Sequence, residues 1–132
     1  MNASLELITG AAITDQQLAE CAVLFSNHYG TWSEHVGKAR AGKRIELSSD
    51  KLRAYLGSNG CIAVATCNKT IIGHVFATKL ILDDECVIVW ITQVVTHKDF
   101  RQGKVATRLM RLIVDYFSKM TTIKGFGVCT AN

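Results

Sequence analysis

The sequence predicts an α+β domain built around a mixed β-sheet. Three β-rich runs follow one another between residues 61 and 96, whereas apolar residues recur at helical intervals before and after that segment. The predicted order of elements is β-α-α-β-β-β-α-β, and the helix that joins the last two strands makes a parallel crossover. With 132 residues, 48% hydrophobic and 20% charged, the chain suits a single domain over residues 1–132.

The N-terminal segment predicts a strand followed by a helix. Residues 5–9 (LELIT) are apolar enough to form a short opening strand. Thr14 precedes Gln17 by three positions, which is the spacing of a capping box at a helix start. The apolar residues that follow at helical intervals, to about Asn27, are Leu18, Cys21, Ala22 and Phe25.

The next segment predicts a loop and a short second helix. Residues 28–44 mix aromatic residues, glycines and cations without a clear period, so we expect a loop with at most one helical turn. Ser48 or Ser49 is placed to cap a helix over residues 50–56, which Gly57 can end.

The central segment predicts three successive strands joined by tight turns. Asn68-Lys69 is a plausible two-residue hairpin turn, and residues 83–85 (DDE) make the next turn. The strands themselves cover residues 61–67, 70–82 and 86–96.

A strongly amphipathic helix follows the third of these strands, and a last strand follows the helix over residues 125–131 (GFGVCTA). We expect Tyr116 to lie in the core, because it falls on the apolar side of the helix. That side contains Val105, Leu109, Leu112, Ile113, Tyr116, Phe117 and Met120. The opposite side contains Arg108, Arg111, Asp115 and Lys119.

Charge, hydropathy and cysteine content exclude several classes of protein. The formal net charge of +4 suits an anionic ligand but falls short of the dense basic surface that nucleic acid requires. No apolar run reaches the roughly 20 residues that a membrane-spanning helix needs, and the N-terminus does not resemble a secretory signal. The five cysteines lack metal-ligand spacing, so we expect reduced thiols, no metal site and a cytoplasmic protein.

The corner between the third strand and the helix, DFRQGKVATRL at residues 99–109, has three interpretations. A nucleotide P-loop fails, because Lys98 stands where the motif needs glycine and Val105 where it needs Ser or Thr. A basic turn that only caps the helix is one alternative that remains. The other is an anion site at the helix N-terminus, where Gly103 and Ala106 leave room for a phosphate. In that case Arg101, Lys104 and Thr107 add hydrogen-bond donors.

Residues 94–110 (VVTHKDFRQGKVATRLM) resemble the acetyl-coenzyme A signature of the GNAT family of N-acetyltransferases, a strand followed by [Q/R]-x-x-G-x-[G/A] at a helix start. Arg101, Val105 and Ala106 match that pattern, and the stretch from IIGHVFATKL to VATRLM looks most like a fungal branch of the family. The resemblance implies a sheet with helices on both faces. It departs from the family at Lys104, where glycine is expected, and after the fifth strand, where further C-terminal elements are expected.

The resemblance also implies a coenzyme site. The pantetheine arm of acetyl-coenzyme A would pair with the strand backbone, and its pyrophosphate would lie at the helix N-terminus. Lys104 would then pair with the pyrophosphate rather than obstruct it. The backbone groups would come from Val94, Val95 and Thr96, and the pyrophosphate loop from Arg101, Gln102, Gly103, Lys104, Val105, Ala106 and Thr107.

The candidate catalytic residues are Thr92 and Gln93, which the strand period places on opposite faces, so that one should face the cleft. Neither is a base at neutral pH. Gln93 could orient a water or the acceptor amine, or it could simply be a polar residue at a strand bulge. His74 and His97 titrate near neutrality, although a lone histidine in such a position is more often structural.

The acceptor residues that we expect are Tyr29, Trp32 and His35, which gather amphipathic side chains in the loop after the first helix. Hydrophobic anchoring of that loop is an equal alternative. The sequence thus predicts an acetyl-coenzyme A-dependent N-acetyltransferase whose acceptor is a primary amine of a small molecule or peptide. The alternatives are a non-catalytic acyl-coenzyme A-binding domain or an inactive fragment of a longer acetyltransferase, with possible homodimerisation through the fifth strand. A nucleic-acid-binding module is disfavoured because stacking aromatics do not interleave the basic residues.

Overall fold

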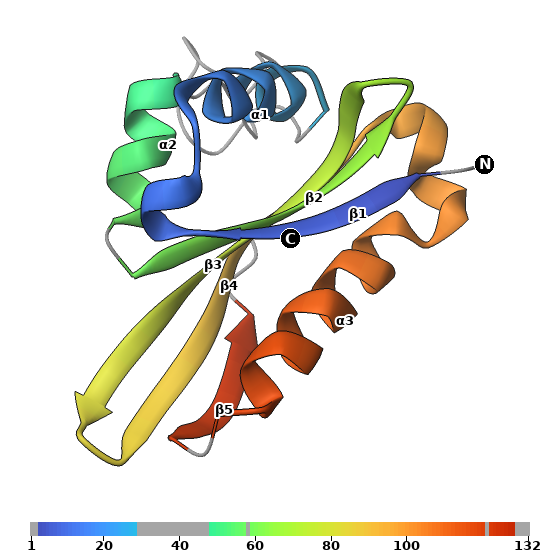
Figure 1. Cartoon of the computed structure of the whole chain (residues 1–132). Coiled ribbons are helices and arrows are strands. Elements are labelled where there is room, and N and C mark those ends of the chain that lie inside the picture. The colour runs from blue at the N-terminus through green and yellow to red at the C-terminus, as the bar shows by residue number, and fades with distance from the viewer. Residues whose placement is uncertain (1–2, 29–47, 58, 121, 129–132) are drawn as a thin grey trace, which may run out of the picture.

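The computed structural model describes residues 3–28, 48–57, 59–120 and 122–128, and it contains one five-stranded sheet in the order β1-β2-β3-β4-β5. The first four strands pair antiparallel with their neighbours, and β5 pairs with β4 in parallel (Figure 1). This confirms the predicted mixed sheet with one parallel crossover. The strands are β1 (Ser4–Thr9), β2 (Gly60–Cys67), β3 (Thr70–Asp83), β4 (Cys86–Thr96) and β5 (Ile123–Val128).

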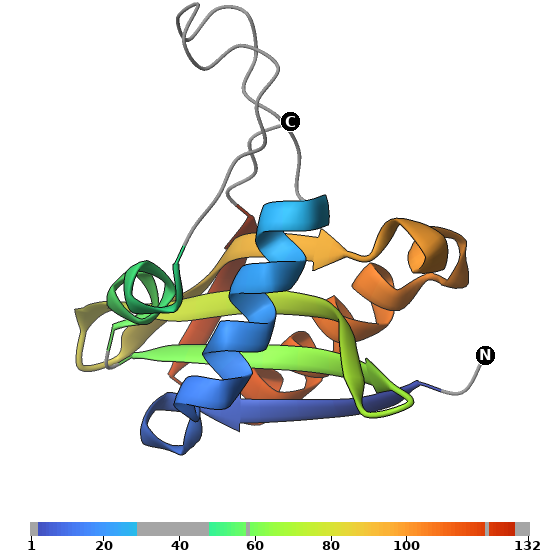
Figure 2. The same ribbon diagram turned by 90° about the horizontal axis from the view of Figure 1, so that it is seen from above.

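Helices cover both faces of the sheet, as predicted. On one face α1 (Asp15–His28) crosses the strands and α2 (Ser49–Leu56) packs beside it, whereas α3 (Val105–Ser118) packs on the opposite face (Figures 1 and 2). Each face buries its own apolar core. The core under α1 and α2 includes Leu18, Leu52, Ile62 and Phe76. The core under α3 includes Val75, Val89, Leu109 and Ile113.

Local sequence signals set the ends of the first two helices. The Thr14 backbone N–H donates to the Gln17 Oε1 at 2.8 Å, and the Gln17 N–H donates to the Thr14 Oγ1 at 3.1 Å, which confirms the capping box. Ser48 accepts from the Lys51 N–H at 3.3 Å at the start of α2. Gly57 ends α2 with a φ of 63°, which only glycine adopts without strain.

The β2–β3 hairpin confirms the predicted two-residue turn. Asn68 and Lys69 both have positive φ, 52° and 66°. This combination matches the right-handed twist of the paired strands, which explains why a lysine tolerates the left-handed region here.

Two short 3-10 turns were not predicted, namely η1 (Gly10–Ala12) and η3 (Lys98–Gly103). The last strand begins at Ile123, two residues before the predicted start, and residues 129–131 of the predicted strand lie outside the described residues. None of the helices in the described part of the chain is long and apolar enough to span a bilayer.

Helix α3 buries one face against the sheet, as its pattern predicts, but Tyr116 is not in the core. Its exposed fraction is 39%, and it borders a groove with Thr9 and Met120. The buried positions recur every fourth residue, which leaves Tyr116 at the edge of the apolar stripe. These positions are Val105, Leu109, Ile113 and Phe117.

The N-terminus of α3 lies close to the sheet because Gly73 has no side chain. A Cβ atom at Gly73 would lie 2.8 Å from the Val105 Cγ1, closer than side chains tolerate. Gly73 pairs with Thr96 at the end of β4, so this contact fixes the helix start beside that strand end.

Candidate functional site

A β-bulge interrupts β4 in the middle of the strand. Phe76 pairs with Gln93 and Ala77 pairs with Ile91, so Thr92 is an extra residue without a partner across the ladder. The Thr92 Oγ1 donates to the Phe76 carbonyl oxygen at 3.4 Å. The strict alternation that we expected for Thr92 and Gln93 is therefore broken by a residue inserted into the ladder.

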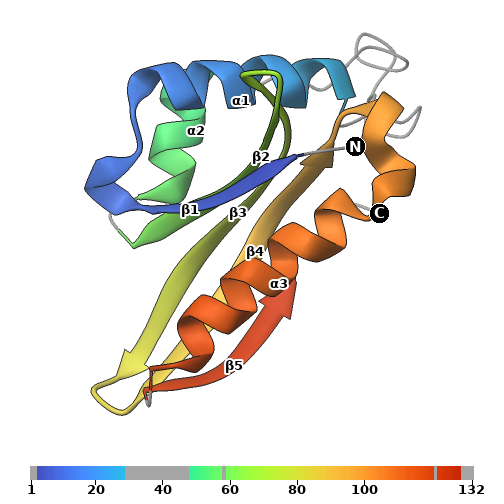
Figure 3. The same cartoon turned by 45° about the vertical axis from the view of Figure 1, so that its right-hand side comes forward.

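Within the described residues, which end at Val128 on β5, strands β4 and β5 pair along only part of β4. The parallel ladder runs from Val87 to Ile91 on β4 and ends at Val128 on β5. Figure 3 shows β4 continuing past the end of β5 towards the start of α3. Among the described residues, no strand pairs with the outer edge of residues 92–96. The predicted pantetheine-binding positions Val94, Val95 and Thr96 lie in this part of β4.

The turn after β4 is tied to the ends of β3 and β4. The His97 N–H donates to the Ile72 carbonyl oxygen at 2.8 Å, and the His97 Nδ1 accepts from the Asp99 N–H at 3.1 Å. The Arg101 Nε donates to the Thr96 carbonyl oxygen at 3.3 Å. These bonds hold η3 against the strand ends, through one backbone bond to β3 and two short-range bonds between side chain and backbone.

The residue that precedes α3 has an unusual backbone conformation. Lys104 has a φ of 58°, in the left-handed region that disfavours side chains with a Cβ. It is the residue at which the GNAT pattern expects glycine, so the position needs glycine-like geometry. Lys104 makes no side-chain cap, and the first turn of α3 contains no acidic residue. The first N–H groups of α3 are therefore left without a side-chain acceptor from its cap residue.

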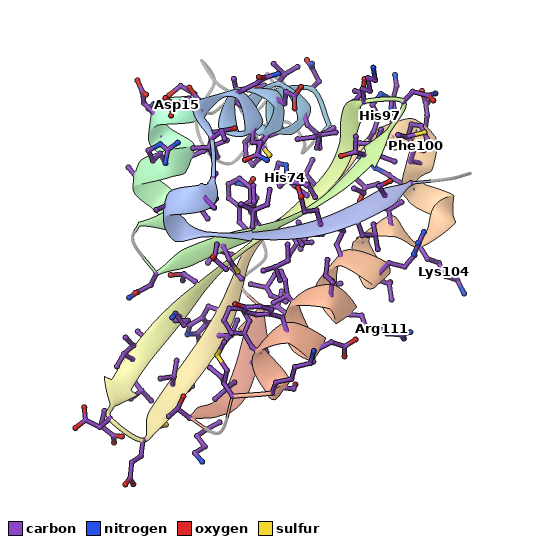
Figure 4. All side chains as sticks on the ribbon, in the orientation of Figure 1. Asp15, His74, His97, Phe100, Lys104 and Arg111 are labelled. Carbon is purple, nitrogen blue, oxygen red and sulfur yellow. The ribbon has the colours of Figure 1, made fainter. Side chains whose placement is uncertain are left out.

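The predicted pyrophosphate residues have different degrees of exposure at this corner. Arg101, Gly103, Lys104 and Thr107 are exposed, and Ala106 is half-buried. Val105 is fully buried under the helix, so it contributes only its backbone. The side chain of Gln102 lies outside the described residues. Figure 4 shows Lys104 on the outer side of α3.

Two polar side chains meet in the interior under α1. The His74 Nε2 and the Gln93 Oε1 are 2.6 Å apart, and the two residues have exposed fractions of 0% and 5%. Figure 4 shows His74 between α1 and the sheet. Because an amide oxygen only accepts, Nε2 carries the proton. The sequence predicted Gln93 as a site residue but did not predict this pairing. The hairpin register offered a signal, because His74 and Gln93 sit diagonally across β3 and β4.

Burial shifts the titration of three interior groups. Burial lowers the pKa of His74 to about 4, and the hydrogen bond to Gln93 offsets part of that effect. Burial raises the pKa of the Cys21 thiol to about 12 and that of the Cys61 thiol to about 11. At neutral pH His74 is therefore uncharged and both thiols are protonated, which makes the thiols poor nucleophiles.

The acceptor residues that the sequence predicted, Tyr29, Trp32 and His35, lie outside the described residues. A cavity of about 310 Å³, which the sequence did not predict, lies between α1 and the beginning of β3. Its lining is mainly apolar and includes one carboxylate. The lining residues are Glu20, Val23, Leu24, Asn27, Thr70, Ile71 and His97. Among the described residues, no three His, Cys, Asp or Glu side chains gather as a metal site would require.

No model of a known protein family matches this chain, and no curated protein matches it in sequence. Solved structures do match it. A ribosomal-protein-alanine N-acetyltransferase from Brucella melitensis biovar Abortus 2308 superposes with a TM-score of 0.68 at 14% identity, covering 96% of this chain and 80% of that one.

Two further solved structures give the same result. A GNAT family acetyltransferase from Staphylococcus aureus matches with a TM-score of 0.66 at 14% identity, over 100% of this chain and 89% of that one. The aminoglycoside N-acetyltransferase AAC(6')-Iy in complex with coenzyme A matches with a TM-score of 0.65 at 13% identity, over 98% and 78%. The chain therefore has the fold of the GNAT acetyltransferases. At these identities the likeness establishes the fold and leaves the activity to be argued from the site.

Proposed function

We propose that this protein is an acetyl-coenzyme A-dependent N-acetyltransferase that acts on a primary amine of a small molecule or a peptide. One observation carries the proposal, namely that β4 has an outer edge beyond Ile91 that no described residue pairs with, and that this edge leads through η3 to a helix N-terminus without a side-chain cap from Lys104. A strand edge and a helix start in this order suit a ligand with amide groups at one end and a pyrophosphate at the other.

The residues at this site fit coenzyme A. Val94, Val95 and Thr96 present a strand edge with which the amides of pantetheine can pair. The first N–H groups of α3 favour an anion, and the Lys104 ammonium adds positive charge beside them. Gly103 is exposed and presents no side chain to block the approach of a phosphate. Acetyl-coenzyme A, when bound, supplies an activated acetyl thioester.

The chemistry asks three things of the protein, namely a neutral amine, donors for a carbonyl oxygen that gains negative charge, and departure of a thiolate. Thr92, Gln93 and Thr96 are the polar side chains in the part of β4 beyond its ladder with β5. Strand β4 contains no carboxylate, so we propose that solvent accepts the proton of the amine. Acetyl transfer by this chain should then be slow.

The names of the structural neighbours support an amine as the acceptor. By their names, the structural neighbours act on a ribosomal protein and on aminoglycosides, which both carry amines. Tyr29, Trp32 and His35 stay our predicted acceptor residues. The cavity beside α1 offers an apolar wall with the Glu20 carboxylate, which suits an amine that carries an apolar group.

A non-catalytic acyl-coenzyme A-binding domain is the second candidate, and the absence of a carboxylate from β4 favours it. Parallel titrations with coenzyme A, acetyl-coenzyme A and an oligonucleotide test the binding class. Thiol release with a panel of primary amines then tests turnover. Binding of coenzyme A without thiol release for any amine would leave the second candidate. Binding of the oligonucleotide alone would overturn both.

The outer edge of β5 is also proposed as a self-association surface. Phe126 and Val128 are 38% and 52% exposed on this strand. Light scattering over a range of concentrations tests the proposal, and Phe126→Ser should shift the equilibrium towards the monomer. A monomer at every concentration would contradict it.

A further inference from the structure

The two buried polar side chains of the described residues, His74 and Gln93, bond to each other across β3 and β4. The bond lies beside the Thr92 bulge, since Gln93 follows Thr92 and pairs with Phe76. The His74 ring also packs on the Phe76 ring, with centroids 4.5 Å apart. The pair therefore ties the two strands together at the point where β4 departs from regular geometry.

This arrangement costs the fold free energy. The His74 Nδ1 is buried and, within the described part of the chain, has no hydrogen-bond partner. A buried acceptor left unsatisfied typically costs about 1–3 kcal/mol, whereas two apolar side chains of similar size would leave no polar atom unpaired. Stability alone therefore does not account for a histidine and a glutamine at these positions.

The direction of the bond determines what Gln93 can offer to a substrate. Its Oε1 accepts from the His74 Nε2–H, so the oxygen is occupied. The amide NH2 group remains, and no described residue accepts from it. A group that can only donate cannot take a proton from an amine, but it can stabilise negative charge on an oxygen.

We propose that His74 is a positioning residue for acetyl transfer, and this inference rests on the proposed function. By holding the Gln93 Oε1, His74 fixes the Gln93 NH2 group as a donor to the acetyl carbonyl oxygen. In the transfer the amine nitrogen forms the C–N bond, the C–S bond breaks with its electron pair on sulfur, and the proton of the amine passes to water. His74 itself touches none of the reacting atoms.

A pair of substitutions at position 74 separates positioning from packing. In His74→Gln the side-chain NH2 can occupy the place of the Nε2–H, so the donor to Gln93 survives. In His74→Leu the volume is largely kept and the donor is lost. We expect kcat to fall at least about tenfold in His74→Leu and to stay within about threefold of the wild type in His74→Gln, with KM for acetyl-coenzyme A unchanged in both. Equal kcat values in the two variants would overturn the inference.

An apolar double variant, His74→Leu with Gln93→Leu, tests the purely structural explanation. It removes the unpaired nitrogen and should unfold at the same temperature as the wild type or higher. We expect kcat to be reduced at least about tenfold in this stable protein. Wild-type turnover in the double variant would overturn the inference. If the double variant fails to fold, the comparison at position 74 still decides.

A spectroscopic measurement separates failure of this inference from failure of the proposed function. In the wild type, the side-chain NH2 resonances of Gln93 should shift when acetyl-coenzyme A is added, and in His74→Leu the shift should be lost. Binding and turnover by the wild type with unmoved Gln93 resonances would overturn the inference alone. A wild type that binds no acetyl-coenzyme A would overturn the proposed function and this inference with it.

Discussion

The interior around His74 and the corner around Lys104 lie at opposite ends of the scale of burial. His74 is fully buried, packs on Phe76 and bonds to Gln93. Lys104 is exposed, and its own side chain makes no cap for the helix that it precedes. Both depart from what a stable fold prefers, the first through an unpaired buried nitrogen and the second through a left-handed lysine.

The two unfavourable features, at His74 and at Lys104, should control different properties of the protein. The interior feature is coupled to packing, so changes there should alter the free energy of unfolding. The corner feature is exposed at the surface, so changes there should alter ligand affinity and leave the fold intact. The four predictions below test this division.

The largest expected effect is the dependence of stability on pH that His74 causes. Its pKa is lowered from 6.5 to about 4 by burial, so between these values the unfolded chain binds more protons than the folded one. The free energy of unfolding is therefore highest above pH 6.5. It decreases as the pH falls towards 4, by a total on the order of 3 kcal/mol. Urea unfolding from pH 7.5 to 4.5 should show this loss in the wild type and a flatter profile in His74→Gln. Identical profiles would contradict the assignment.

Gly73→Ala should affect both regions, because Gly73 lies between them. Its Cβ would lie 2.8 Å from the Val105 Cγ1, so α3 must shift away from the sheet. Overpacking of this kind costs about 1–3 kcal/mol. We expect reduced stability and also weaker coenzyme A binding, since the start of α3 moves. Gly125→Ala is the control, because its Cβ would meet nothing within 4 Å. Equal losses of stability in the two variants would disprove the packing explanation.

Gly103→Asp should weaken binding without weakening the fold. The carboxylate would bring negative charge to the proposed pyrophosphate site, and we expect at least about a tenfold loss of affinity for coenzyme A, or roughly 1.4 kcal/mol. Asn59→Asp adds the same charge beside Phe117 and Met120, at the other end of α3, where it should leave affinity unchanged. Isothermal titration calorimetry with both variants provides the measurement. Unchanged binding in a folded Gly103→Asp protein would refute the site.

Substitutions of Lys104 should have the smallest effect on coenzyme A binding, and Lys69 provides a matched control. Lys104→Gly and Lys69→Gly each remove a left-handed lysine, and each should change the free energy of unfolding by no more than about 1 kcal/mol. Only changes at position 104 should alter affinity. We expect Lys104→Ala and Lys104→Gly to bind coenzyme A about two- to fivefold more weakly, and more so at low salt. Tighter binding in Lys104→Gly would mean that the lysine obstructs the loop.

The predictable parts of the fold are those that depend on neighbours in sequence. The Thr14 capping box, the Ser48 cap and the Asn68-Lys69 turn are local, and each was predicted. The amphipathic period also predicted α3 and the face that it buries. It failed at Tyr116, because a helix edge is half-exposed and the period alone does not state how far the sheet extends beneath it.

The corner before α3 was predictable in position but not in its detail. A motif placed Lys104 before the helix, although its left-handed conformation is a property of the folded turn. A bulge in β4 was only an alternative for Gln93, because a period of two assumes an unbroken ladder. The bond between His74 and Gln93 lies beside that bulge and joins residues from two strands. Side-chain pairs of this kind follow from register, which composition does not encode.

The β2–β3–β4 meander has a consequence for the order in which the chain folds. Its strands follow one another in sequence through two short turns, so their pairing closes small loops and loses little chain entropy. Pairing of β5 with β4 must instead wait for the crossover through α3. We expect the meander to form early and α3 to dock late. The bulge in β4 would then form before the corner that precedes α3. During refolding, the time at which coenzyme A binding appears would show when α3 docks on the sheet.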